Sequence, residues 1–91
     1  MEIVYAERFY KELSKLPARV QQSVKQVLIK LKAASNLESS GVDYALMRGR
    51  AKGAKYYRIR VGDYRIGVKY IHPDMIVIII ARRGEIYKLS S

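Results

Sequence analysis

The feature that most constrains the fold of this chain is the run YYRIRVGDYRIGVKY at residues 56–70. Two segments that alternate apolar with polar residues flank Gly62 and Asp63. A two-residue connection of this kind predicts a β-hairpin, because glycine readily takes the positive φ that the turn requires. The turn also sets the register of the two strands, so that Arg60 is expected directly opposite Arg65.

Because side chains alternate along a strand, this register sorts the hairpin into two faces. The apolar face, expected to pack under helices, consists of Tyr57, Ile59, Val61, Tyr64, Ile66 and Val68. The other face consists of Tyr56, Arg58, Arg60, Arg65, Gly67 and Lys69. The like-charge pair of Arg60 and Arg65 costs up to about 1 kcal/mol, and Gly67 is expected to leave an open slot beside Arg58. We interpret this face as an anion-binding site. The alternative is a solvated face whose charge is balanced by acids elsewhere, such as Glu85.

The rest of the chain predicts an α+β fold with the order β-α-α-β-β-β. Two amphipathic segments, residues 6–16 and 18–34, are separated by Pro17 and predict a two-helix hairpin packed on one face of a small, mainly antiparallel sheet. The continuous β-branched run at residues 75–81 predicts a strand buried on both faces. The remaining expectations are a first strand at 2–5, a loop at 35–42, a short strand or lead-in at 44–47, a basic loop at 48–55, turns at 72–74 and 82–85, and a closing strand at 86–88.

The composition favours one globular domain over residues 1–91. Hydrophobic residues make up 49% of the chain and there is no cysteine, which excludes a disulfide framework and a thiolate metal site. The chain shows neither the pattern of a signal peptide nor an apolar run long enough to cross a bilayer. We therefore expect a soluble, cytoplasmic protein.

The net charge of +10 predicts a polyanionic partner: nucleic acid, an anionic membrane surface or an acidic protein. Residues 1–47 carry seven Lys/Arg and five Asp/Glu, whereas residues 48–91 carry eleven and three, so most of the excess lies in the second half. Basic and tyrosine side chains mixed on one surface suit RNA, because cations bind phosphates and aromatic rings stack on bases. The expected contact residues around the hairpin are Arg48, Arg50, Lys52, Lys55, Tyr56, Lys69 and Arg82.

Other kinds of site find little support in the sequence. His72, the only histidine, falls in a predicted turn. No group of His, Cys, Asp and Glu has the spacing of a metal site, so neither a metal nor a cofactor is expected. Gly49 and Gly53 lack the ending of a phosphate-binding loop, and the acids show no convincing catalytic pair. Any chemistry is therefore expected to use arginine, lysine and tyrosine.

The layout, the run Y-x-I-x-x-G-x-Y-R-I at residues 57–66 and the ending ARRGEIYK at residues 81–88 resemble the RelE/ParE superfamily of toxins from type II toxin–antitoxin pairs. The resemblance covers nearly the whole chain. It implies a RelE-like, microbial-RNase-like fold. RelE-like members cleave mRNA in the ribosomal A site without a metal, whereas ParE-like members inhibit DNA gyrase. A basic nucleic-acid-binding module without activity is a third reading.

The RelE-like reading implies attack of a ribose 2′-OH on the adjacent phosphate. It places Arg58, Arg60 and Arg65 among the catalytic residues, with Arg65 and Arg58 stabilising the phosphate. Arg83 is then expected to stabilise the leaving group. Some family members carry lysine before the hairpin turn where this chain has arginine. Because arginine stays protonated, it cannot easily act as the general base, and Tyr87 is left for that role.

The resemblance also leaves one assignment open and implies partners. Arg82 replaces Arg83 if the turn after the buried strand is read differently.

The implied partners are the ribosome, mRNA and a cognate antitoxin. An acidic antitoxin segment is expected to wrap the basic half of the chain. It would either mask the arginines or displace the segment that bears Tyr87.

Overall fold

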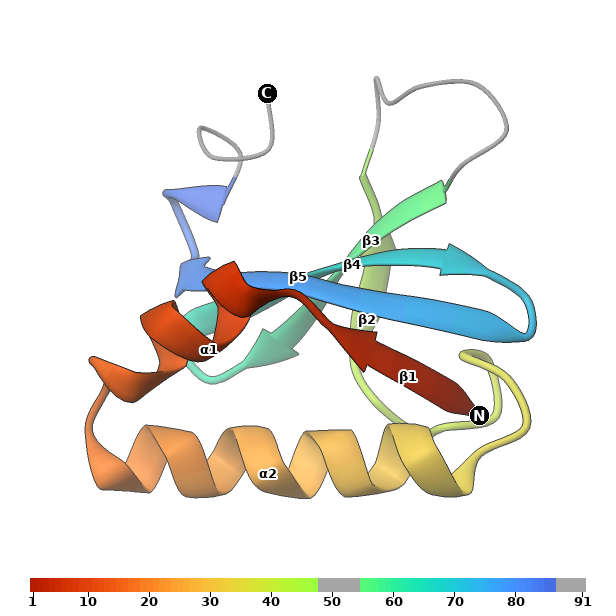
Figure 1. Ribbon diagram of the computed structural model, residues 1–91, viewed down its shortest axis with the longest axis horizontal. Coiled ribbons are helices and arrows are strands. Elements are labelled where there is room, and N and C mark those ends of the chain that lie inside the picture. Colours follow the sequence, from red (N-terminus) through yellow and green to blue (C-terminus); the bar gives the residue numbers. More distant parts are fainter. Residues whose placement is uncertain (48–54, 87–91) are drawn as a thin grey trace.

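The computed structural model describes residues 1–47 and 55–86, which form one five-stranded sheet and two helices (Figure 1). The strand order is β1-β5-β4-β3-β2; β1 runs parallel to β5, and the other three pairings are antiparallel. This confirms the predicted α+β class and a mainly antiparallel sheet. The elements are β1 (Glu2–Tyr5), α1 (Glu7–Ser14), α2 (Ala18–Ala33), β2 (Tyr44–Leu46), β3 (Lys55–Val61), β4 (Tyr64–Ile71) and β5 (Asp74–Arg82).

The β3–β4 hairpin has the predicted turn and the predicted register. Gly62 has a φ of 59°, and Asp63 has no positive φ, which is the pattern of a turn that needs glycine at its first central position. Arg60 pairs with Arg65, and Arg58 pairs with Gly67. The three arginines therefore share one face of the sheet, which we call the second face to distinguish it from the helix face.

Both helices contribute apolar side chains to one core on the helix face. Phe9 of α1, together with Val24 and Leu31 of α2, belongs to the same buried cluster as Ile59 and Ile66 of the hairpin. Pro17 caps the start of α2, as expected from a residue that ends one helix and begins the next. The helix pair thus covers the apolar face that the hairpin register predicted.

Aromatic packing holds the junction between the end of β1 and the start of α1. The rings of Tyr5 and Phe9 are stacked with centroids 5.9 Å apart, and Tyr10 lies 5.6 Å from Tyr5. Burial raises the pKa of the Tyr5 phenol, and the neighbouring Tyr10 raises it further. Tyr5 therefore remains a neutral, packed ring across the physiological range.

The prediction that the 75–81 strand is buried on both faces is correct for one end only. Ile79, Ile80 and Ala81 are buried on alternate sides of β5, but Ile76 is 38% exposed. A register shift between Gly67 and Val68 of β4 falls between these two parts. The chain therefore buries the second face near the hairpin turn and leaves it open toward the start of β5.

The open slot predicted at Gly67 is wrong, because neighbouring side chains fill it. Gly67 is buried, and a β-carbon placed there would lie 3.1 Å from Ile79 Cγ2 and 3.5 Å from Ile86 Cδ1. The turn after β5, closed by the hydrogen bond from the Glu85 N–H to the Arg82 carbonyl at 2.9 Å, reverses the chain onto the second face. Glycine is needed here for close packing.

Ile86 was predicted to begin a closing strand, and this is wrong: it is helical and fully buried. The other two residues of that predicted strand lie outside the described part of the chain. Within residues 1–47 and 55–86, no helix is both long and apolar enough to cross a bilayer.

The packing at Gly67 predicts that Gly67→Val lowers the free energy of unfolding by about 1–3 kcal/mol, the usual penalty for overfilling a packed site. Gly84→Val is the matched control, because a β-carbon at Gly84 meets nothing within 4 Å. Urea denaturation of both variants measures the difference. Equal stability of the two variants would contradict the packing of Ile79 and Ile86 on this glycine.

Candidate functional site

Three arginines of the hairpin line one cavity of about 170 Å³ on the second face. Arg58 and Arg60 come from β3, and Arg65 comes from β4. The rest of the described lining is Asp43, Tyr44 and Ala45. We call this site the arginine pocket.

The pocket is closed on one side by the short strand β2. Ala45 pairs with Arg58 in the antiparallel β2–β3 register, and the Arg60 N–H donates a hydrogen bond to the Asp43 carbonyl at 2.8 Å. Because side chains on paired residues point to the same face, Asp43 and Arg60 meet across this edge. The backbone therefore positions a carboxylate beside the arginines.

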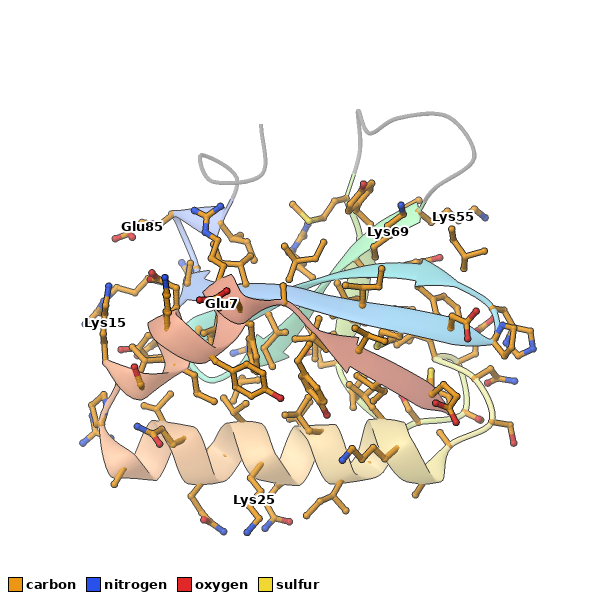
Figure 2. The ribbon with its side chains drawn as sticks, viewed as in Figure 1. Glu7, Lys15, Lys25, Lys55, Lys69 and Glu85 are labelled. Atoms are coloured by element: carbon orange, nitrogen blue, oxygen red, sulfur yellow. The ribbon has the colours of Figure 1, made fainter. Side chains whose placement is uncertain are left out.

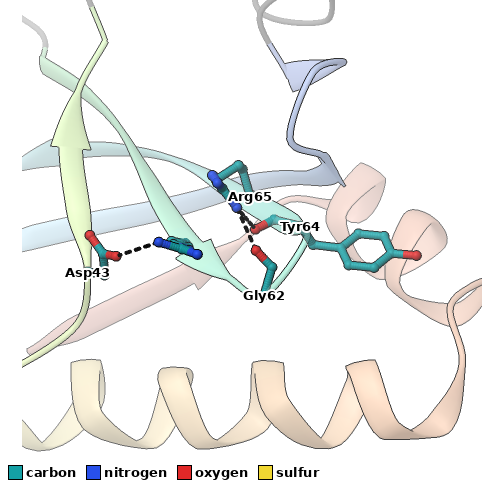
Figure 3. Close-up of polar contacts among 5 residues, drawn as sticks. Asp43, Gly62, Tyr64 and Arg65 are labelled. Carbon is teal, nitrogen blue, oxygen red and sulfur yellow. Dashed lines mark hydrogen bonds and ion pairs between the residues drawn. The ribbon is translucent and has the colours of Figure 1, made fainter.

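The two members of the like-charge pair have different oxygen partners: Arg65 donates hydrogen bonds to carbonyls, and Arg60 forms a long ion pair. The Arg65 guanidinium donates from Nη1 to the carbonyls of Gly62 and Tyr64, at 2.8 and 2.9 Å (Figure 3). Arg60 Nη1 lies 3.9 Å from Asp43 Oδ2. The acid that partly balances this face is thus Asp43; Glu85, the balancing acid suggested by the sequence, lines a different cavity.

The pocket is small and open to an incoming anion. Cavities that hold drug-sized ligands are typically about 300–1,000 Å³, so the arginine pocket fits one anionic group. The side chains of Arg60 and Asp43 are 60% and 69% exposed. An ion pair that exposed contributes little to stability. A phosphate, which accepts paired hydrogen bonds from a guanidinium fork, can therefore compete with it.

The two arginines at the end of β5 have different surroundings. Arg83 is exposed, and its N–H donates to the Asp63 carbonyl at 3.0 Å, which holds this turn against the hairpin turn near Arg65. Arg82 pairs with Tyr64, and its guanidinium lies 5.5 Å from the centre of the Tyr64 ring. Arg82 therefore lies on the helix side of the sheet, away from the arginine pocket.

The remaining predicted contact residues that the structure describes, Lys55, Tyr56 and Lys69, do not share one face of the sheet. Lys55 and Lys69 are seen near the same end of the sheet in Figure 2. Lys69 pairs with Tyr56 on the second face, and Gly67 lies between Lys69 and the pocket. Lys55 lies on the opposite face, together with Tyr57, because side chains alternate along β3. The predicted site residues Arg48, Arg50, Lys52 and Tyr87 lie outside the described residues.

Asp43 is the pocket residue that the sequence reasoning missed. In the sequence, Asp43 is one of several acids that show no catalytic pair. Its position follows from the β2–β3 register, and the eight-residue sequence between these strands contains no two-residue turn signal that would fix the pairing. In the described part of the chain, no three His, Cys, Asp or Glu side chains gather as a metal site would require.

Comparison with known proteins gives one relative and several solved structures of similar shape, while no protein-family model matches the chain. The toxin RelE3 of Methanocaldococcus jannaschii is 29% identical over 87 residues, which span 96% of each chain. The toxin in the crystal structure of a RelB–RelE antitoxin–toxin complex from Methanococcus jannaschii aligns with a TM-score of 0.77. That alignment has 26% identity and covers 97% of this chain and 99% of that one. An archaeal RelE–RelB complex from Pyrococcus horikoshii OT3 shares the fold, with a TM-score of 0.72, 19% identity and coverage of 91% and 94%.

Proposed function

We propose that this chain, which is similar over nearly its whole length to RelE toxins, is the toxin of a toxin–antitoxin pair and cleaves mRNA in the ribosomal A site. The observation that carries the proposal is the convergence of Arg58, Arg60 and Arg65 on one small cavity. Such a toxin acts in the cytoplasm, where translating ribosomes supply its substrate.

The proposed reaction is transesterification within the RNA chain. The 2′ oxygen attacks the adjacent phosphorus, the bond to the 5′ oxygen breaks, and the products are a 2′,3′-cyclic phosphate and a 5′-OH end. Negative charge accumulates on the phosphorane oxygens as the new bond forms. Guanidiniums fixed around that position stabilise the charge more than they stabilise the substrate, and this difference accelerates the reaction.

The packing of the hairpin supports this use of the three arginines. Their backbone is held by paired strands, which places the three side chains on the same face. Two carbonyls of the turn accept hydrogen bonds from Arg65 and orient its guanidinium. We propose that Arg65 and Arg58 hold the scissile phosphate, that Arg60 joins them when the phosphate displaces Asp43, and that Arg83 stabilises the leaving group.

The proposed partner is an antitoxin. Two solved structures of similar fold are complexes of a RelE toxin with a RelB antitoxin. The excess of positive charge in the second half of this chain gives an acidic antitoxin segment a surface to mask. Covering the arginine pocket would block the site without changing the fold.

We predict that Arg65→Ala lowers the rate of mRNA cleavage by about 100-fold or more, the usual effect of removing one preorganised donor to a developing charge. Primer extension on a defined mRNA in a translating extract measures cut sites at A-site codons. Tyr87→Phe is expected to reduce cleavage as well. Arg8→Ala is the matched control, because Arg8 is exposed on α1.

Cleavage that persists in Arg65→Ala at the rate of Arg8→Ala would contradict the role of the arginine pocket. Intact mRNA with the wild-type protein would contradict the nuclease itself. DNA gyrase supercoiling would then be assayed, because ParE-like toxins act on that enzyme.

We also predict that the toxin–antitoxin complex weakens as salt concentration rises, because exposed charges are screened over about 10 Å at 0.1 M ionic strength. Titration calorimetry between about 0.1 and 0.5 M NaCl measures the change in Kd. Arg60→Ala should reduce the salt dependence more than Arg8→Ala does. A Kd that is independent of salt would contradict masking by charge.

A further inference from the structure

We infer that Asp43 is a catalytic residue of the proposed reaction, the general base that removes the proton from the ribose 2′-OH. This inference rests on the proposed function. The sequence offers Tyr87 for this role, because arginine cannot accept a proton at neutral pH, but Tyr87 lies outside the described residues. Among the described residues that line the arginine pocket, Asp43 is the one carboxylate.

The geometry places this carboxylate where a base is needed. Asp43 Oδ2 lies 3.9 Å from Arg60 Nη1, so a phosphate bound by Arg60 brings its own ribose next to Asp43. The Asp43 side chain is 69% exposed and therefore accessible to substrate. Its backbone is held against β3 by the hydrogen bond from the Arg60 N–H to the Asp43 carbonyl.

The charges around Asp43 argue that it does more than neutralise the pocket. The groups that face it are Arg58 and Arg60 from β3 and Arg65 from β4. An exposed pair of this length contributes little to stability, and a negative charge in a phosphate site repels the ligand. The same carboxylate favours the reaction if it accepts the 2′-OH proton. It then becomes neutral while negative charge develops on the phosphorane oxygens.

The step balances without any further reagent. The 2′ O–H proton moves to Asp43 Oδ, the bond from the 2′ oxygen to phosphorus forms, and the bond from phosphorus to the 5′ oxygen breaks. The 5′ oxygen receives a proton from water. Release of the 2′ proton from Asp43 to water then restores the carboxylate.

The test compares Asp43→Asn with Asp74→Asn, the same substitution at an exposed aspartate at the start of β5. Cleavage rates are measured on programmed ribosomes over a range of toxin concentrations. If Asp43 is the base, Asp43→Asn lowers the maximal rate about 100-fold or more. The concentration for half-maximal rate stays the same or falls, because a repulsive charge has been removed. The thermal unfolding midpoint should match that of Asp74→Asn.

A second variant makes the result specific to proton transfer. Asp43→His replaces the carboxylate with another base, so cleavage should return in part and rise with pH around about 6.5, the ordinary range of imidazole. The same assay on Asp74→Asn should show no such new titration. A pH-dependent recovery of this kind is not expected from a residue that only orients Arg60.

Two results would overturn the inference. One is cleavage by Asp43→Asn at the wild-type rate or faster, which would make Asp43 a charge-balancing residue. The other is Asp43→His activity no higher than that of Asp43→Asn at every pH. These outcomes differ from failure of the proposed function, in which the wild-type protein and the Asp74→Asn variant also leave the mRNA intact.

Discussion

The two-residue turn at Gly62 and Asp63 is the constraint on which the site depends. It fixes which β3 residue faces which β4 residue, and a slip of one position would turn every side chain of one strand to the other face. In the observed register, Ile59 and Ile66 lie under the helices while Arg60 and Arg65 lie together on the second face. The apolar core and the cationic pocket are thus two consequences of one pairing, and the burial of the first holds the second in place.

The close approach of like charges in the pocket explains both its local contacts and its use. Arg65 is directed toward the carbonyls of its own turn, and Arg60 toward a carboxylate that lies 3.9 Å away and is largely exposed. These contacts reduce the repulsion without filling the site, since the cavity that the arginines line is open. In the proposed function, a phosphate bound there would relieve the same repulsion more completely. The stability lost by pairing two arginines would then be offset when an anion binds.

Local patterns predicted much of this fold. The hairpin register and the two helices separated by Pro17 follow from alternation, helical spacing and turn residues. Contacts between segments distant in sequence did not follow from such patterns. Gly67 was expected to leave a slot, and Ile86 fills it only because the turn after β5 reverses the chain onto the second face. Arg82 lies over Tyr64 because the β4–β5 register places it on the helix side. Asp43 lies in the pocket because β2 pairs with β3, and no turn residue in the sequence predicts that pairing.

The most direct test of the account is a structure of the protein on a translating ribosome whose A-site mRNA carries a 2′-O-methyl group at the cleaved nucleotide, so that attack is blocked. The account predicts the scissile phosphate within about 3 Å of guanidinium nitrogens of Arg58, Arg60 and Arg65. The modified 2′ oxygen should lie on the side of Asp43. A scissile phosphate bound elsewhere on the protein, with the arginine pocket facing solvent or rRNA, would contradict it.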